Sequence, residues 1–162
     1  MHHAIGIKNT PVFTSKTDDF HKKKIKYGAP LTSSPAAWDT IRTHLNDTGR
    51  TPGFYDLIVT GDLGRLGSEL LKELARRDGV TLDRHADCGL LIFEPNSQDV
   101  HCGGSGCGCC ASVLASFLLP GLREGKWKNI LFCPTGALHS PTTAFQGESI
   151  PGISHAVAIS AE

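Results

Sequence analysis

Apolar residues recur along the chain in two patterns, one with the period of an α-helix and one with the length of a buried strand. Trp38, Ile41 and Leu45 follow Ser34-Pro35 at helical intervals, and serine followed by proline is typical of the first positions of a helix. The predicted helices cover about 34–49, 66–79 and 107–122, the last of them frayed at Pro120-Gly121. Short apolar runs predict strands at 55–60, 89–93, 129–133 and 156–160.

The order of these elements is helix, strand, helix, strand, helix, strand, strand. Strands that alternate with helices favour an α/β fold, with a mixed sheet and helices packed on it. Residues 34–162 carry the strong patterns and form the predicted domain. Residues 1–33 are a poorly defined arm with room for one strand at 5–13, and their lysine run at 22–24 reads as a solvated segment or as a contact with an anionic surface.

Composition narrows the class of protein. The chain has 162 residues, of which 40% are hydrophobic and 20% charged, so it is long enough and apolar enough for one globular domain. Its 16 basic and 16 acidic residues balance, which argues against a nucleic-acid partner. The longest apolar stretch, at 113–122, falls short of the roughly 20 residues of a membrane span. Six cysteines without a secretory signal predict free thiols in a reducing compartment.

Three glycine-rich loops adjoin the predicted core elements. They are TGDLG at 60–64, GGSGCGCC at 103–110 and CPTGALHSPT at 133–142. Two of them follow strands, and open α/β sheets bind ligands at the carboxyl ends of their strands. Each loop by itself is also explained as a tight turn, although three in one chain weaken that explanation. The candidate ligand-binding residues are Asp62, Gly104, Ser105, Gly106, Cys107, Thr135, Gly136 and Ser140.

The second loop precedes a predicted helix, where backbone N–H groups and the helix dipole favour an anion. It is neither a Walker A loop nor a dinucleotide fingerprint, because the Gly-Lys-Ser/Thr and GxGxxG patterns are missing. Asp62 is the carboxylate of the three loops, and it serves either as a cap for the helix near Leu66 or as a ligand contact. Asp87-Cys88-Gly89 reads as a turn.

The cysteines of this region have three interpretations: metal ligands, small packing residues or a nucleophile. Cys107 and Cys110 have C-x-x-C spacing, but no second spaced cluster of ligands occurs elsewhere in the chain, so we expect no metal and no cofactor, and packing is the favoured reading. A nucleophile needs a nearby base, and His101, His139 and His155 qualify only by their position in the chain. The alternative function is therefore an acyltransferase that uses Cys107, Cys109 or Cys110.

Several stretches resemble a known family. They are DLIVTGDLGRLGSELLKEL, DCGLLIFEP, GGSGCGCCASV, LREGKW, TGALHSPT and ESIPGISHAV. Together they resemble, over about residues 35–160, the C-terminal half of the stage V sporulation protein AD family of endospore-forming bacteria. That family has the thiolase-like fold, so the resemblance implies a thiolase-like half domain.

The resemblance also implies a function. Family members bind dipicolinic acid and act in its uptake into the developing spore, together with membrane proteins. The implied location is cytoplasmic, or peripheral at the forespore inner membrane. The nucleophilic cysteine of catalytic relatives lies in the other half, and their Gly-His-Pro histidine falls here at about Ser105. The resemblance therefore implies binding without catalysis, and an inactive truncated fragment is a further alternative.

A half domain also implies a partner surface. The helix around 107–119 is small and apolar nearly all round, and such a helix is normally buried on every side. We expect it to meet a missing N-terminal half or a second copy of the chain in a homo-oligomer.

Overall fold

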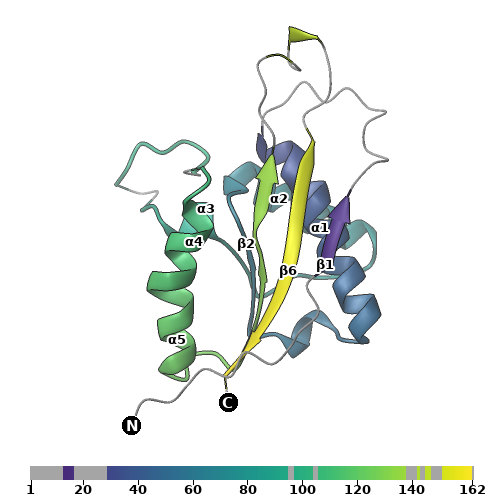
Figure 1. Cartoon of the computed structure of the whole chain (residues 1–162), viewed down its shortest axis with the longest axis vertical. Coiled ribbons are helices and arrows are strands. Elements are labelled where there is room, and N and C mark those ends of the chain that lie inside the picture. Colours follow the sequence, from purple (N-terminus) through teal and green to yellow (C-terminus); the bar gives the residue numbers. More distant parts are fainter. Residues whose placement is uncertain are drawn as a thin grey trace.

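The computed structural model describes residues 13–16, 29–94, 97–103, 106–137, 142, 145–146 and 151–161. Within these residues one sheet has the strand order β1-β6-β4-β2-β3, and β5 pairs with β6 beside this path (Figure 1). The strands are β1 (Phe13–Lys16), β2 (Leu57–Thr60), β3 (His85–Asp87), β4 (Asn129–Cys133), β5 (Thr135–Ala137) and β6 (Gly152–Ser160). The α/β class and the mixed sheet, both expected from the sequence, are confirmed.

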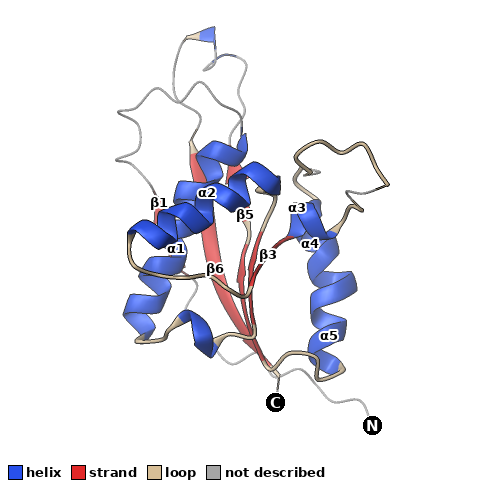
Figure 2. Ribbon diagram, turned by 180° about the vertical axis from the view of Figure 1, so that it is seen from behind, coloured by secondary structure: helices blue, strands red, loops and turns tan. Residues whose placement is uncertain are grey.

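The sheet is parallel on one side and antiparallel on the other. β2 pairs in parallel with both β3 and β4, whereas β6 runs antiparallel to β4, β1 and β5. The helices are α1 (Ala29–Thr48), α2 (Gly64–Arg77), α3 (Cys88–Leu91), α4 (Cys109–Val113) and α5 (Leu119–Arg123), with a short 3₁₀ turn, η2, at Pro52–Phe54. Figures 1 and 2 show α1 and α2 on one face of the sheet and α4 and α5 on the other.

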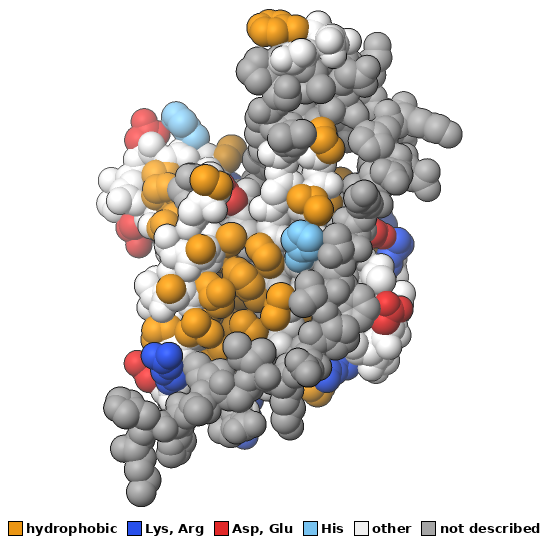
Figure 3. Space-filling view, viewed as in Figure 1, with side chains coloured by type: hydrophobic (Ala, Val, Ile, Leu, Met, Phe, Trp, Pro, Cys, Tyr) orange, Lys and Arg blue, Asp and Glu red, His pale blue; other side chains and the backbone are white. Residues whose placement is uncertain are grey.

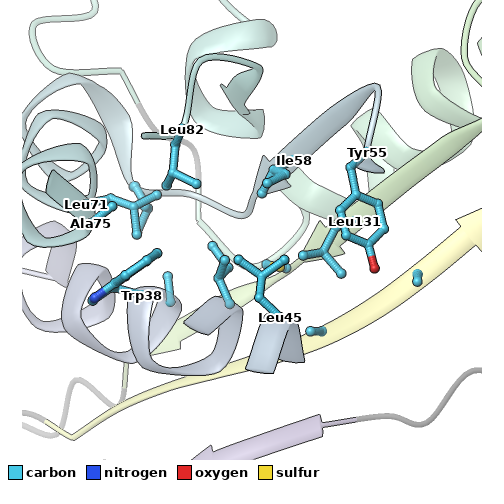
Figure 4. Packing of buried hydrophobic residues seen from close by; sticks show 14 residues of the cluster. Trp38, Leu45, Tyr55, Ile58, Leu71, Ala75, Leu82 and Leu131 are labelled. Carbon is cyan, nitrogen blue, oxygen red and sulfur yellow. The ribbon is translucent and has the colours of Figure 1, made fainter. Parts of the chain in front are cut away.

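Successive side chains of a strand point to opposite faces of the sheet, so an apolar strand contributes to the core on both faces. On β2, Ile58 belongs to the cluster under α1 and α2, whereas the next residue, Val59, belongs to the cluster under α4 and α5. Trp38 and Leu45 of α1 and Leu71 of α2 pack into the first cluster (Figure 4). The helical spacing that predicted α1 is thus the spacing of its buried face, whereas on α2 Leu71 is buried and Leu66 is exposed.

The chain from Cys109 to Arg123 is one continuous helix with a wide turn in its middle. This π-helical turn, η3 (Leu114–Leu118), joins α4 to α5. Its last bond runs from the N–H of Leu119 to the carbonyl of Leu114. Pro120 has no N–H and clashes with a regular preceding turn, and the wide turn absorbs this misfit. The helix therefore continues to Arg123 and does not fray at Pro120-Gly121 as expected.

The strand expected at 89–93 is wrong. The edge strand β3 ends earlier, at Asp87, and Cys88–Leu91 form the short helix α3. Leu91 and Ile92 are exposed and lie outside the sheet. A short apolar run does not distinguish a buried strand from a turn of helix.

The expected start of the first helix at Ser34 is also wrong, because α1 begins at Ala29 and Pro35 lies inside it. The Ser34 hydroxyl is buried and donates to the carbonyl of Gly67 at 2.8 Å, so it joins α1 to α2 from the interior of the helix. The start of α1 and strand β1 both fall in the segment expected to be a loose arm. Of the strand expected at 5–13, residues 5–12 lie outside the described residues, and β1 begins at Phe13.

The continuous helix is buried on one side and exposed on the other. Val113 and Leu118 face the sheet, whereas Ala111 and Ala115 are exposed. Half-buried apolar residues lie beside this exposed side, on the helix itself and on the neighbouring strands and loops, and Figure 3 shows apolar side chains gathered on this face of the molecule. They are Leu57, Leu114, Leu119, Trp127, Val157 and Ala161. Among the described helices, none combines the length and the apolar character that a bilayer span requires.

We expect this surface to drive self-association of the isolated chain, because large exposed apolar patches mark interaction sites. Light scattering at micromolar concentration measures the molar mass directly. A mass of two chains or more is the expected result. A stable monomer of 17.3 kDa that melts sharply would contradict the expectation.

Candidate functional site

A cavity of about 410 Å³ lies where the three glycine-rich loops meet. Among the described residues, the first loop contributes one lining residue, the second contributes three, and strand β5 contributes three more. Helix α1 closes the cavity with one hydroxyl. The lining residues are Ser33, Asp62, Gly106, Cys107, Cys110, Thr135, Gly136 and Ala137.

Strand register brings the first and third loops together. β2 and β4 are parallel neighbours, and Thr60 lies opposite Cys133 at their carboxyl ends. Gly61 then passes so close to the third loop that a Cβ at this position would lie 2.6 Å from the backbone nitrogen of Thr135. Next along the chain, the N–H of Asp62 donates to the Thr135 hydroxyl at 3.3 Å. Glycine at position 61 is therefore a requirement of the close approach.

Asp62 links the first loop to the second. Its Oδ2 accepts the backbone N–H of Gly106 at 2.5 Å. This bond places the carboxylate at the rim of the cavity. The two roles expected for Asp62, a cap for α2 and a ligand contact, stay predictions.

Asp87, expected to be part of a turn, anchors the start of α2. It is 1% exposed at the end of β3. Its Oδ1 accepts the Thr60 hydroxyl at 2.7 Å and the N–H of Leu63 at 3.0 Å, and its Oδ2 accepts the N–H of Gly64 at 2.9 Å. The bonds from Leu63 and Gly64 give an acceptor to two of the backbone N–H groups that a helix start leaves unsatisfied. Burial raises the pKa of Asp87 to about 6, although its hydrogen bonds oppose the shift.

His85 completes this polar network on β3. Its Nε2 lies 2.9 Å from the Thr60 hydroxyl. Burial lowers the pKa of His85 to about 4, so the ring is neutral at pH 7. Because Thr60 donates its proton to Asp87, the hydroxyl oxygen accepts from the Nε2–H of His85. The network is thus a chain of bonds from His85 through Thr60 to Asp87.

The three cysteines considered as nucleophiles differ in their surroundings. Cys109 is 2% exposed and packs in the core, which fits the packing interpretation. Cys110 lines the cavity, but burial raises the pKa of its thiol, which disfavours the reactive thiolate. Cys107 is exposed at the cavity. Over the described parts of the chain, no group of three or more His, Cys, Asp or Glu side chains is placed to hold a metal ion.

The structure brings five of the eight predicted site residues to one cavity. They are Asp62, Gly106, Cys107, Thr135 and Gly136. Gly104, Ser105 and Ser140 lie outside the described residues, as does His139. Sequence reasoning missed Ser33, whose hydroxyl lies 3.5 Å from the carbonyl of Gly136. It also missed the role of Asp87. The available signal was that Leu63, the N-cap residue of α2, has no polar side chain, so another residue had to bind the free N–H groups there.

One of the solved structures similar to this chain has low sequence identity. The crystal structure of 3-oxoacyl-[acyl-carrier-protein] synthase III from Aquifex aeolicus VF5 aligns with 85% of this chain and 40% of its own, at 15% identity and a TM-score of 0.46. Similarity at this level does not establish a shared reaction.

Two sequence comparisons are decisive. The family model of stage V sporulation protein AD (SpoVAD) matches residues 6–160, so the match begins well before residue 35, where the resemblance was expected to start. The stage V sporulation protein AD of Bacillus subtilis (strain 168) is 49% identical over 125 residues, which are 76% of this chain and 37% of that protein. The chain thus spans little more than a third of the length of this relative. It belongs to the stage V sporulation protein AD family.

Proposed function

We propose that the cavity binds dipicolinic acid and that the chain takes part in the uptake of this acid into the developing spore, without catalysis. The observation that carries the proposal is the convergence of all three glycine-rich loops on one cavity. Its volume of about 410 Å³ lies in the range of small-molecule sites.

The chemistry of the lining suits a small flat ligand. Dipicolinate has an aromatic ring with two carboxylates beside the ring nitrogen. The hydroxyls of Ser33 and Thr135 are donors for carboxylate oxygens. Cys107 and Ala137 offer weakly polar and apolar surface to the ring. Gly106 and Gly136 leave the backbone open to close approach by a flat molecule.

The charge of Asp62 opposes a dianion in the same cavity, since like charges repel. Its hydrogen bond to the N–H of Gly106 withdraws part of that charge from the cavity and keeps the rim in place. We assign Asp62 the role of holding the rim, and we assign ligand contact to the hydroxyls and the glycine backbone.

Gly106→Leu is the test of the proposal. Gly106 has φ +87° and nothing within 4 Å of the place of a Cβ, so a leucine there projects from the cavity lining without a clash. Calorimetric titration with dipicolinate is expected to show binding to the parent chain and at least a hundredfold weaker binding to the variant.

Gly125→Leu is the matched control. Gly125 follows α5, has φ +74°, and is equally open, so it carries the same backbone strain away from the cavity. Both variants should lose similar stability, about 1 kcal/mol, and only Gly106→Leu should lose affinity. If the two variants bind dipicolinate with equal affinity, the ligand does not bind in this cavity.

In the cell we place this binding step beside membrane proteins that carry the acid across the inner membrane of the forespore. Family membership supports this placement. The exposed apolar side of helix Cys109–Arg123 is available for such a partner, for the remaining part of a longer protein or for a second copy.

A further inference from the structure

The cavity rim is held by a relay of hydrogen bonds that starts outside the cavity. Gly106 on the rim is bound by Asp62. Asp62 lies in the loop between β2 and α2, and this loop is bound on both sides by Asp87. Asp87 does not line the cavity.

The position of Asp87 explains how one side chain fixes a whole loop. Thr60 precedes Asp62 by two residues, and Leu63 and Gly64 follow it directly. Because the three bonds of Asp87 go to these flanking residues, the backbone at Asp62 is clamped from both directions. His85 holds Thr60 from its other side at 2.9 Å, which fixes the hydroxyl that Asp87 accepts.

The clamp is rigid because of where it lies. Asp87 and Thr60 are 1% and 0% exposed, and buried hydrogen bonds to a carboxylate are strong and directional. A connection with one glycine in the loop, Gly61, and another at the first position of α2, Gly64, would otherwise sample many conformations. The carboxylate of Asp62 would then meet the N–H of Gly106 only part of the time.

We propose that Asp87 is a positioning residue, which sets the place of Asp62 and, through Asp62, the place of the Gly106 rim. The consequence of this positioning for ligand binding rests on the proposed function. Its structural part concerns the coupling of Asp87 to Gly106 and is measurable without any ligand.

Amide hydrogen exchange of Gly106 in the full chain tests the coupling. In the parent, the bond to Asp62 protects this amide. Asp62→Ala removes the acceptor of this bond, so its Gly106 exchange rate is the reference value for the unprotected amide. Asp87→Asn leaves Asp62 in place but weakens the clamp, and it should raise the Gly106 exchange rate at least tenfold toward that limit.

Three further variants separate positioning from stability. Thr60→Val removes one donor to Asp87 and serves as the milder variant if Asp87→Asn does not fold. Thr60→Ser keeps the hydroxyl and should restore the parent rate. Ile41→Ala creates a cavity in the core on α1, so it lowers global stability while leaving the clamp intact, and the Gly106 rate should stay at the parent value.

Calorimetry with dipicolinate completes the experiment. Asp87→Asn and Thr60→Val should bind at least tenfold more weakly than the parent, and Ile41→Ala should bind as the parent does. If Gly106 exchange is unchanged in both clamp variants, or rises equally in Ile41→Ala, the positioning role is wrong. If the parent itself fails to bind dipicolinate, the proposed function is wrong, and the exchange rates still decide the role of Asp87.

Discussion

Replacing Gly64 with alanine is expected to cost about 3 to 5 kcal/mol of unfolding free energy. Gly64 is the first residue of α2 and has φ +65°. A Cβ there would lie 2.5 Å from the carbonyl oxygen of Cys102, which is backbone and cannot rotate away. The same carbonyl accepts the N–H of Arg65 at 2.6 Å, so relief of the clash breaks this bond. Strain from the positive φ adds about 1 kcal/mol or more.

Gly79→Ala separates the clash from the strain. Gly79 lies just after the other end of α2, has φ +75°, and has nothing within 4 Å of a Cβ. It should lose only about 1 kcal/mol. Urea unfolding of both variants at pH 7 measures the difference, which we expect to exceed 2 kcal/mol. Equal losses would show that the loop ending at Gly103 does not pack on the start of α2 as described.

The second large effect is on the pH dependence of stability, where His85 and Asp87 act in opposite directions. Burial lowers the pKa of His85 from 6.5 to about 4, so the stability that comes from its neutral ring is lost as pH falls from 6.5 toward 4. Burial raises the pKa of Asp87 from 3.8 to about 6, so stability is lost as pH rises from 3.8 toward 6. Each effect amounts to about 3 kcal/mol over its window.

The two contributions to the pH dependence of the unfolding free energy oppose each other in the parent, and a variant that removes one of them should reveal the other. Relative to the parent, Asp87→Asn should become less stable as pH falls from 6.5 to 4, and His85→Gln should become more stable. Urea unfolding at half-unit pH steps measures both slopes. His44 is buried and its lowered pKa acts like that of His85, but it is common to all three proteins and drops out of the comparison. Slopes of the same sign in the two variants would contradict the assignment.

The sequence predicted the core elements where periodicity and length agreed. Ile58 and Val59 belong to an apolar run of strand length, and the residues at helical spacing on α1, Trp38, Ile41 and Leu45, are all buried. The prediction failed at 89–93, because a turn of helix at a sheet edge has the same apolar composition as a strand. It failed at Ser34-Pro35, because a local capping signal was overridden by the tertiary bond from Ser34 to Gly67.

The site was predicted to a similar extent. Glycine-rich loops at the carboxyl ends of parallel strands must lie side by side, so Asp62 and Thr135 could be placed together from the sequence. Ser33 and Asp87 could not, because their roles depend on contacts with segments 103 and 23 to 27 residues away, respectively. Such contacts leave no local pattern in a single sequence.

The most direct test of the central claim is an NMR titration of the ¹⁵N-labelled chain with dipicolinate. The account predicts the largest saturable shifts at the amides of Asp62, Gly106, Thr135, Gly136 and Ala137, which line the cavity. The groove beside α3, lined by Leu91, Ile92 and Phe117, is the internal control and should not respond. Saturable shifts confined to that groove, or no saturable shift at all, would contradict the claim that the cavity binds dipicolinate.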